Sequence, residues 1–157
     1  MMKTKLFNTK RNRMDNSQRG QSLIEVALSL TFMLIMLAGA VDVGRIFIAY
    51  ISMRDAAQEG IAFGSVFPTY CNQIVQRTIS SSTNMFQPTA GMVTISIGGA
   101  DCASADPEQA CIGNEIIVTI SNPAYPLTMP FIGAALGSQT IPLEVSARDT
   151  VLRPPCP

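Results

Sequence analysis

A single carboxylate stands at the point where the sequence turns apolar. Glu25 lies five residues after Gly20 and directly before the run Val26–Val41, which contains no charged residue. A carboxylate costs about 2.5 to 3.5 kcal/mol at the centre of a bilayer, and less toward its surface, unless it meets a cation. The chemistry open to Glu25 is therefore an ion pair with a positive group supplied from elsewhere. The alternative is that its side chain reaches the membrane surface and has no further role.

The four cysteines are the second set of reactive side chains. Cys71, Cys102, Cys111 and Cys156 all follow the apolar run. Disulfides persist outside the cytoplasm, whereas a zinc site would need four thiolates from distant positions, because the chain has no histidine and no C-x-x-C spacing. We therefore expect disulfides. Of the three possible pairings we favour Cys102 with Cys111, which closes a short loop between two strands. Cys71 would then pair with Cys156, a bridge worth about 4 to 5 kcal/mol in the chain-entropy model.

Other chemistry has little support in the sequence. Without histidine there is no Ser-His or Cys-His pair, the chain has no glycine-rich phosphate-binding loop, and its carboxylates are scattered. Asp101, Asp106 and Glu108 lie near two cysteines, but their spacing matches no calcium-loop rule, and a solvated loop is the better interpretation. The sequence thus predicts a protein that is not an enzyme, with no metal and no cofactor assigned.

Charge and composition indicate a membrane protein with its N-terminus in the cytoplasm. The chain is 47% apolar and only 14% charged. Six of its eleven basic residues precede position 20, against one acid, whereas five basic and ten acidic residues follow Gly20. A basic segment before an apolar one stays in the cytoplasm. We therefore expect residues 1–20 to be an unfolded cytoplasmic leader and the rest of the chain to face outward, beyond the membrane.

The elements that must position these residues begin with one long helix. Segment 21–42 is long enough to cross a hydrocarbon core of about 30 Å, and apolar spacing of three and four residues continues through 43–66 without a proline. The residues that recur at this spacing are Val43, Phe47, Tyr50, Met53, Ala57 and Ile61. A second row, spaced by four, is small at six of seven places and suits close packing by the protein's own sheet or by a neighbouring helix. This row contains Ala40, Gly44, Ile48, Ser52, Ala56, Gly60 and Gly64.

The remaining residues, 67–157, predict a small β-rich head closed by disulfides. Segments 92–98, 115–121 and 140–152 are rich in β-branched residues and are separated by turn-forming clusters. They predict three antiparallel strands, with at most a short helix between the second and third. The fold class is therefore α+β, a long N-terminal helix whose first half is transmembrane, followed by the antiparallel sheet of the head.

The residues around Gly20 also resemble a known leader. Gly20 followed by Gln21-Ser22-Leu23-Ile24-Glu25 is similar to the leaders of type IV pilin-like proteins. The resemblance implies that a membrane aspartyl peptidase, the prepilin peptidase, cleaves between Gly20 and Gln21. It also implies an assembly role for Glu25, which would pair with the new N-terminal amine of a neighbouring subunit.

Three further stretches make the resemblance more specific. "RGQSLIEVALSL", "VDVGRIFIAY" and "RDAAQEGIAFGS" resemble the N-terminal region of TadE-like proteins, minor pilin or pseudopilin components of the tight adherence (Tad, or Flp) pilus, and the likeness extends over most of residues 19–153. It implies a structural subunit in the cytoplasmic membrane, possible incorporation into an extracellular pilus, and partners among other pilin subunits, the assembly platform and lipid, with no nucleic acid. Asp42, Gly44 and Arg45 match the family's D-x-G-R element. We expect this element at the outer membrane-water interface, as an anchor or as a subunit contact.

Two alternatives remain open from the sequence. Ala38-Gly39-Ala40 supplies a small-residue site at which a signal peptidase would release a secreted binding protein. The other alternative is an uncleaved, membrane-anchored scaffold of the same apparatus.

Overall fold

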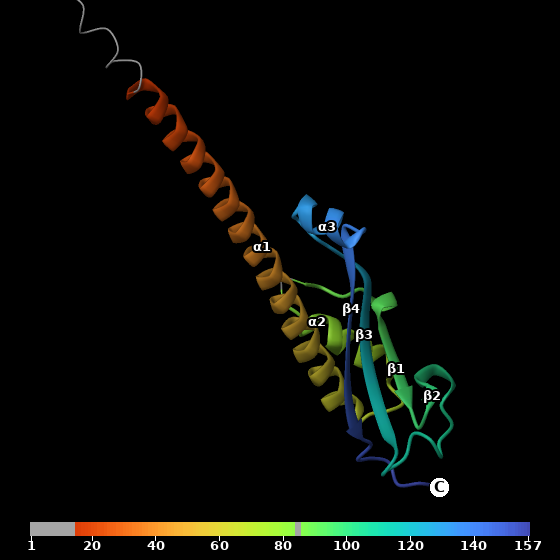
Figure 1. Cartoon of the computed structure of the whole chain (residues 1–157). Coiled ribbons are helices and arrows are strands. Elements are labelled where there is room, and N and C mark those ends of the chain that lie inside the picture. The colour runs from red at the N-terminus through yellow and green to blue at the C-terminus, as the bar shows by residue number, and fades with distance from the viewer. Residues whose placement is uncertain (1–14, 84–85) are drawn as a thin grey trace, which may run out of the picture. The chain divides into compact units, whose positions relative to one another are not determined.

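The computed structural model describes residues 15–83 and 86–157, which fall into two units, Met1–Val41 and Asp42–Pro157. Helix α1 (Asp15–Gly64) supplies the described part of the first unit and the beginning of the second. Residues 15–20, expected in the unfolded leader, are helical, and residues 1–14 of the leader lie outside the described residues. The predicted long helix is confirmed (Figure 1).

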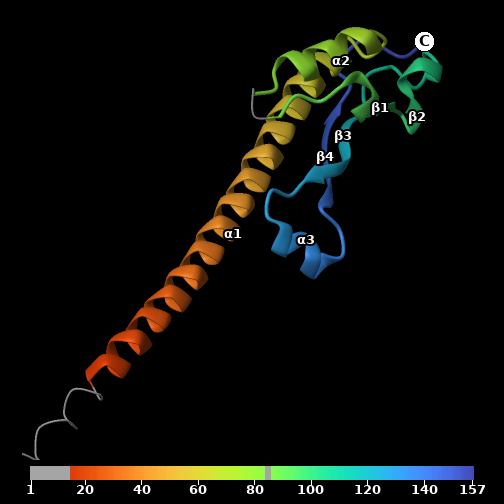
Figure 2. The ribbon, with the colours of Figure 1, turned by 90° about the horizontal axis from the view of Figure 1, so that it is seen from above.

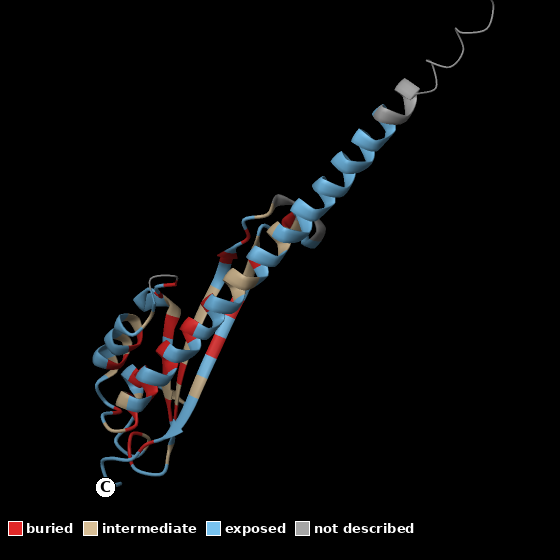
Figure 3. Cartoon of the chain, turned by 90° about the vertical axis from the view of Figure 1, so that its left-hand side faces the viewer, coloured by how far each residue is buried: buried red, intermediate tan, exposed pale blue. Residues whose placement is uncertain are grey.

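Within the first unit, the side chains of residues 20–41 are almost all exposed and none is buried (Figure 3). Two hydroxyl groups of this stretch bond to the helix's own backbone. Ser29 Oγ donates a hydrogen bond to the carbonyl of Val26 at 3.0 Å, and Thr31 Oγ1 donates to that of Ala27 at 2.8 Å. A helix that satisfies its backbone and hydroxyl groups internally is the kind of segment that tolerates a hydrocarbon environment.

The second unit is a small sheet covered by helices on one face. Four strands lie in the order β2-β1-β3-β4, and every neighbouring pair is antiparallel (Figure 1). After α1 its elements are α2 (Cys71–Ser80), the 3-10 turn η1 (Ala90–Met92), β1 (Val93–Ile97), β2 (Ala100–Asp101), the 3-10 turn η2 (Cys102–Ser104), β3 (Glu115–Pro126), α3 (Pro130–Leu136) and β4 (Thr140–Thr150). The three predicted strands are β1, β3 and β4, and α3 is the short helix allowed between the last two. Strand β2 and helix α2 were not predicted.

Alternation along the strands builds the core. In β1 the buried residues Val93, Ile95 and Ile97 point to one face of the sheet, where they pair across to Ile120, Val118 and Ile116 of β3. Residues of α1 and α2, among them Met53 and Ile74, belong to the same buried cluster. The two helices therefore cover the apolar face of the sheet (Figure 2).

The apolar residues that recur along the outer part of α1 are only partly buried. Met53, Ala57 and Ile61 are buried, but Val43, Phe47 and Tyr50 are exposed. The outer part of the small-residue row also faces the rest of the unit: Ser52, Ala56, Gly60 and Gly64 are all buried. A Cβ at Gly60 would collide with Thr78 Oγ1 of α2, and a Cβ at Gly64 would lie 2.8 Å from Ile116 Cδ1 of β3. Small residues are needed here because α2 and the sheet approach the helix backbone closely.

The predicted disulfide pairing is wrong, although all four cysteines are bonded as expected. The bridges are Cys71–Cys102 and Cys111–Cys156, with Cα atoms 5.9 and 4.9 Å apart. Cys102 does not reach Cys111, because the short hairpin of β1 and β2 directs η2 toward the beginning of α2, where Cys71 lies.

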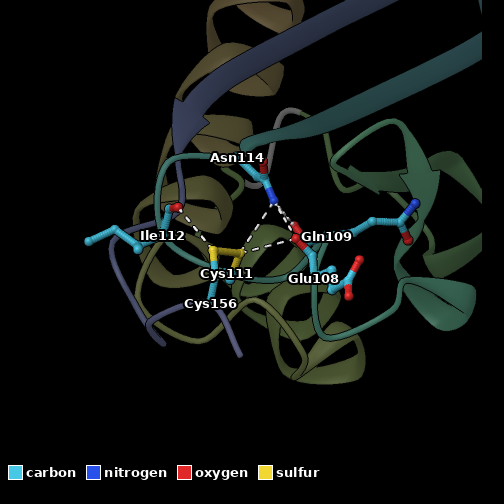
Figure 4. Close-up of a disulfide and its surroundings, with 6 residues drawn as sticks. All are labelled: Glu108, Gln109, Cys111, Ile112, Asn114 and Cys156. Atoms are coloured by element: carbon cyan, nitrogen blue, oxygen red, sulfur yellow. Dashed lines mark hydrogen bonds between the residues drawn. A yellow bond between two sulfur atoms is a disulfide. The ribbon is translucent and has the colours of Figure 1, made fainter.

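The chain end reaches Cys111 because it runs back along the loop before β3. The amide of Gly113 donates to the carbonyl of Val151, the amide of Val151 donates to the carbonyl of Asn114, and the amide of Ile112 donates to that of Pro154. Asn114 Nδ2 also donates to the carbonyls of Glu108 and Gln109, at 2.7 and 3.1 Å, and so shapes the loop around the bridge (Figure 4).

Candidate functional site

The first candidate site is the start of the apolar part of α1. Gly20, Gln21 and Glu25 are all helical and exposed. A Cβ added at Gly20 would meet open space, so no packing requirement accounts for this glycine. Among the residues that the structure describes, Glu25 forms no ion pair and no hydrogen bond through its side chain. Its neighbours one turn and two turns along the helix are Leu28, Ser29 and Phe32, so the carboxylate lies beside a mainly apolar surface.

This stretch has the properties of a membrane anchor. Among the described residues, one helical segment, Gly20–Gly64, is long and apolar enough to cross a membrane by its length and composition, and none of its most apolar part is buried within the protein. The exposure distinguishes it from the core helix of a soluble domain, whose apolar residues would be covered.

The second candidate site is built around Asp42. This carboxylate is buried, with 3% of its side chain exposed, and it accepts two backbone hydrogen bonds from the loop between β3 and α3. Met129 N donates to Oδ2 at 2.7 Å, and Thr128 N donates to Oδ1 at 3.4 Å. Arg45 Nη1 lies 3.6 Å from Oδ1 on the solvent side. Hydrogen bonds from amides and a nearby guanidinium are what a buried carboxylate needs to remain charged.

A third contact holds the same two segments together. The hydroxyl of Tyr125, at the end of β3, lies 3.5 Å from the carbonyl oxygen of Arg45, to which it donates. Asp42 and Arg45 therefore lie together, and the loop before α3 and Tyr125 of β3 bond to them. A Cβ at Gly44 would meet open space, so packing does not require this glycine.

Sequence reasoning missed Tyr125, Thr128 and Met129 as partners of the D-x-G-R element. One signal pointed toward them: Pro130 follows Met129, and proline is favoured at the first position of a helix, where backbone amides lack helical partners. The sequence did not reveal which carboxylate accepts from those amides, since Asp42 is 87 residues away from Met129.

The described residues contain no group of three or more His, Cys, Asp or Glu side chains placed to hold a metal ion. Asp101 and Glu108, two of the acidic residues that could have served as calcium ligands, are exposed.

Residues 20–61 match the family model described as TadE-like protein. The chain is TadE-like over this segment. The match includes Gly20, Glu25, Asp42 and Arg45, whereas Tyr125, Thr128 and Met129 of the second site lie outside it. No curated protein and no solved structure matches the chain.

The matched segment, residues 20–61, suggests a pilin-like protein related to the Tad pilus. The apolar N-terminal helix fits a single-pass membrane anchor by its length and composition.

Proposed function

We propose that the chain is a prepilin-like subunit of a Tad-type pilus or of its assembly complex. A prepilin peptidase cleaves the precursor between Gly20 and Gln21, and the mature protein stays in the cytoplasmic membrane until it is assembled through its N-terminal helix. One coincidence carries the proposal: the TadE-like match begins at residue 20, where an exposed Gly20 precedes by five residues an exposed Glu25 that has no partner among the described residues.

The proposed orientation places the N-terminus in the cytoplasm and the head outside. Residues 1–20 form the leader, 21–42 cross the membrane, 43–66 continue the helix and 67–157 form the head. Six of the eleven basic residues precede position 20, which holds that end in the cytoplasm. The two disulfides support an oxidising environment for the head.

Glu25 supplies the assembly contact in this proposal. It pairs with the amine that cleavage creates on Gln21 of an adjacent subunit, or with a cation of a partner. An intermolecular cation removes the cost of holding a lone carboxylate beside apolar side chains. The exposed apolar residues Val43, Phe47 and Ile51 extend the surface that a neighbouring helix would cover.

Intact mass of the protein purified from its own membranes tests the cleavage. The expected mature chain begins at Gln21, and Gly20→Leu should leave the full-length precursor. Gly39→Leu is the matched control, because a Cβ at either glycine meets open space, so neither substitution disturbs packing. A wild-type mass that corresponds to cleavage after Ala40 would indicate secretion, and an uncleaved wild-type chain would indicate a permanent scaffold. Either result contradicts the proposal.

Glu25→Gln separates assembly from anchoring. A neutral amide is cheaper to hold near lipid than an unpaired carboxylate, so insertion and cleavage should be retained while pilus output, or co-purification with the pilus machinery, falls. Leu28→Gln is the control for polarity in the same stretch and should impair insertion itself. Normal piliation in the Glu25→Gln strain, with the protein still required for pili, would show that Glu25 has no role in assembly.

A further inference from the structure

The end of the second unit that carries α3 lacks charge. From Ile116 to Leu143 there are 28 consecutive residues without Asp, Glu, Lys or Arg. This stretch includes the end of β3, all of α3 and the beginning of β4. Leu136 in α3 is 62% exposed, and Pro126 and Ala134 are exposed as well. A soluble domain would ordinarily place charged side chains on such a protruding segment.

The position of this segment along α1 is set by Asp42. The amides of Thr128 and Met129, directly before α3, donate to the Asp42 carboxylate. Asp42 is also the first charged residue after the uncharged run Val26–Val41. At about 1.5 Å per residue, the twenty residues 22–41 span a hydrocarbon core of about 30 Å, which brings Asp42 to the level of the lipid headgroups. The residues bonded to Asp42 must lie at nearly the same level.

The opposite end of the unit is different in character. The loop around Cys111 and the chain end carry Glu108, Asp149 and Arg153, all exposed. The charged and uncharged ends of one small unit are thus segregated, and the uncharged end is the one tied to the end of the apolar run. The charges of Asp42 and Arg45 at this end neutralise each other.

We propose that residues 126–139, which contain α3, form a membrane-surface contact that rests on the outer leaflet where α1 leaves the bilayer. The partner is lipid: apolar side chains such as Leu136 enter the boundary between headgroups and acyl chains, as interfacial segments do to a depth of about 5 to 10 Å. Continuity with the predicted transmembrane segment favours lipid over a protein partner. The contact holds the sheet at a defined height above the membrane, through the Asp42 bonds, before any assembly takes place. The inference rests on the membrane anchor and is independent of leader cleavage.

Single tryptophan probes test the contact, since the chain has no tryptophan of its own. Leu136→Trp, Ile112→Trp and Leu34→Trp are introduced separately into the full chain, which is reconstituted into phosphatidylcholine vesicles with and without brominated acyl chains. Ile112 is the matched control, because it is also an exposed aliphatic residue, at 54%, and its side chain points outward from the charged end (Figure 4). Leu34 reports on the predicted transmembrane segment.

We expect brominated lipid to remove about half or more of the emission of Leu136→Trp and of Leu34→Trp, and to leave that of Ile112→Trp unchanged. The emission of Leu136→Trp should also shift to shorter wavelength on reconstitution. Intact mass under non-reducing conditions verifies that both disulfides form in each variant.

Three outcomes overturn the proposal. Quenching at Leu34→Trp without quenching at Leu136→Trp would leave the anchor intact and remove the α3 contact. A blue-shifted but unquenched Leu136→Trp whose emission depends on protein concentration would assign this surface to a second copy of the chain. Absence of quenching at Leu34→Trp would show that α1 does not enter the bilayer. The proposed contact of α3 with lipid would then be wrong as well, because it depends on that anchor.

Discussion

The two parts of helix α1 use apolar residues in opposite ways. In residues 20–41 large side chains project on all sides and none is buried, and Leu28 is 73% exposed. In residues 42–64 one face is buried in the second unit, and it is made largely of small residues around Met53, which is 0% exposed. Hydrophobicity alone therefore does not tell how a helix is covered. Large residues suit a fluid surrounding such as lipid, whereas glycine and alanine let a sheet and a second helix approach the backbone closely.

The buried face of α1 begins at Asp42, and it occupies only one side of the helix. Asp42 itself is buried, while Val43 and Phe47 on other sides remain exposed. The second unit thus covers α1 on one face only. The exposed apolar side beyond Asp42 is available for the assembly contacts proposed above.

The largest effect should come from a bridge in the second unit. Replacing both Cys111 and Cys156 by serine opens a loop of sequence separation 45 and should lower the free energy of unfolding of this unit by about 4 kcal/mol in the chain-entropy model. The urea midpoint in detergent, followed by near-ultraviolet circular dichroism, measures the loss. Membrane fractionation should not change, because residues 20–41 need no contact with the bridge. Loss of membrane association would show that residues 20–41 depend on the fold of the second unit.

A pair of matched truncations in α1 sharpens the contrast. Met53→Ala leaves a cavity in the core and should lower the free energy of unfolding by about 2 to 5 kcal/mol. Leu28→Ala shortens an equally apolar side chain at an exposed position and should leave the urea midpoint of the second unit unchanged. Both replacements keep good helix-forming residues, so helix propensity contributes little. Equal midpoints for the two variants would mean that the buried half of α1 does not support the sheet.

A smaller effect is expected at the boundary itself. Asp42→Ala leaves the amides of Thr128 and Met129 without an acceptor and should lower the melting temperature of the second unit by several degrees. Asp42→Asn keeps a carbonyl acceptor but loses the attraction to Arg45, so its melting temperature should lie between that of Asp42→Ala and that of the wild type. Hydrogen exchange at Met129 should accelerate in the same order. An unchanged exchange rate in Asp42→Ala would show that the carboxylate does not hold this loop.

The smallest effect should come from a surface ion pair on the sheet. Arg148 Nη1 lies 3.5 Å from Glu115 Oε1, and both side chains are more than half exposed. A double-mutant cycle with Arg148→Ala and Glu115→Ala should give a coupling below about 0.5 kcal/mol that disappears with added salt. A coupling larger than the effect of Asp42→Ala would show that burial at the boundary is not what gives Asp42 its importance.

The sequence was sufficient for the features that depend on local pattern. The uncharged run Val26–Val41 predicted the exposed part of α1, because a long apolar segment after a basic one is typical of a membrane-spanning helix. Alternating β-branched residues predicted β1 and β4 close to their observed bounds, and β3 from its observed start but five residues short of its end at Pro126. The glycine, the glutamate five residues later and the D-x-G-R element were enough to recognise the TadE-like segment that the family match confirms.

What only the tertiary structure decided were the relations between distant residues. The partners of Cys71 and Cys111, the loop that Asp42 holds and the face of α1 that is buried all depend on how the hairpin of β1 and β2, the unpredicted helix α2 and the returning chain end are packed. Loop length favoured Cys102 with Cys111, but a disulfide forms only where the fold brings the two Cα atoms within about 7 Å. Periodicity gave two rows of residues along α1, and the fold buries the outer members of both, with α2 lying close against Gly60.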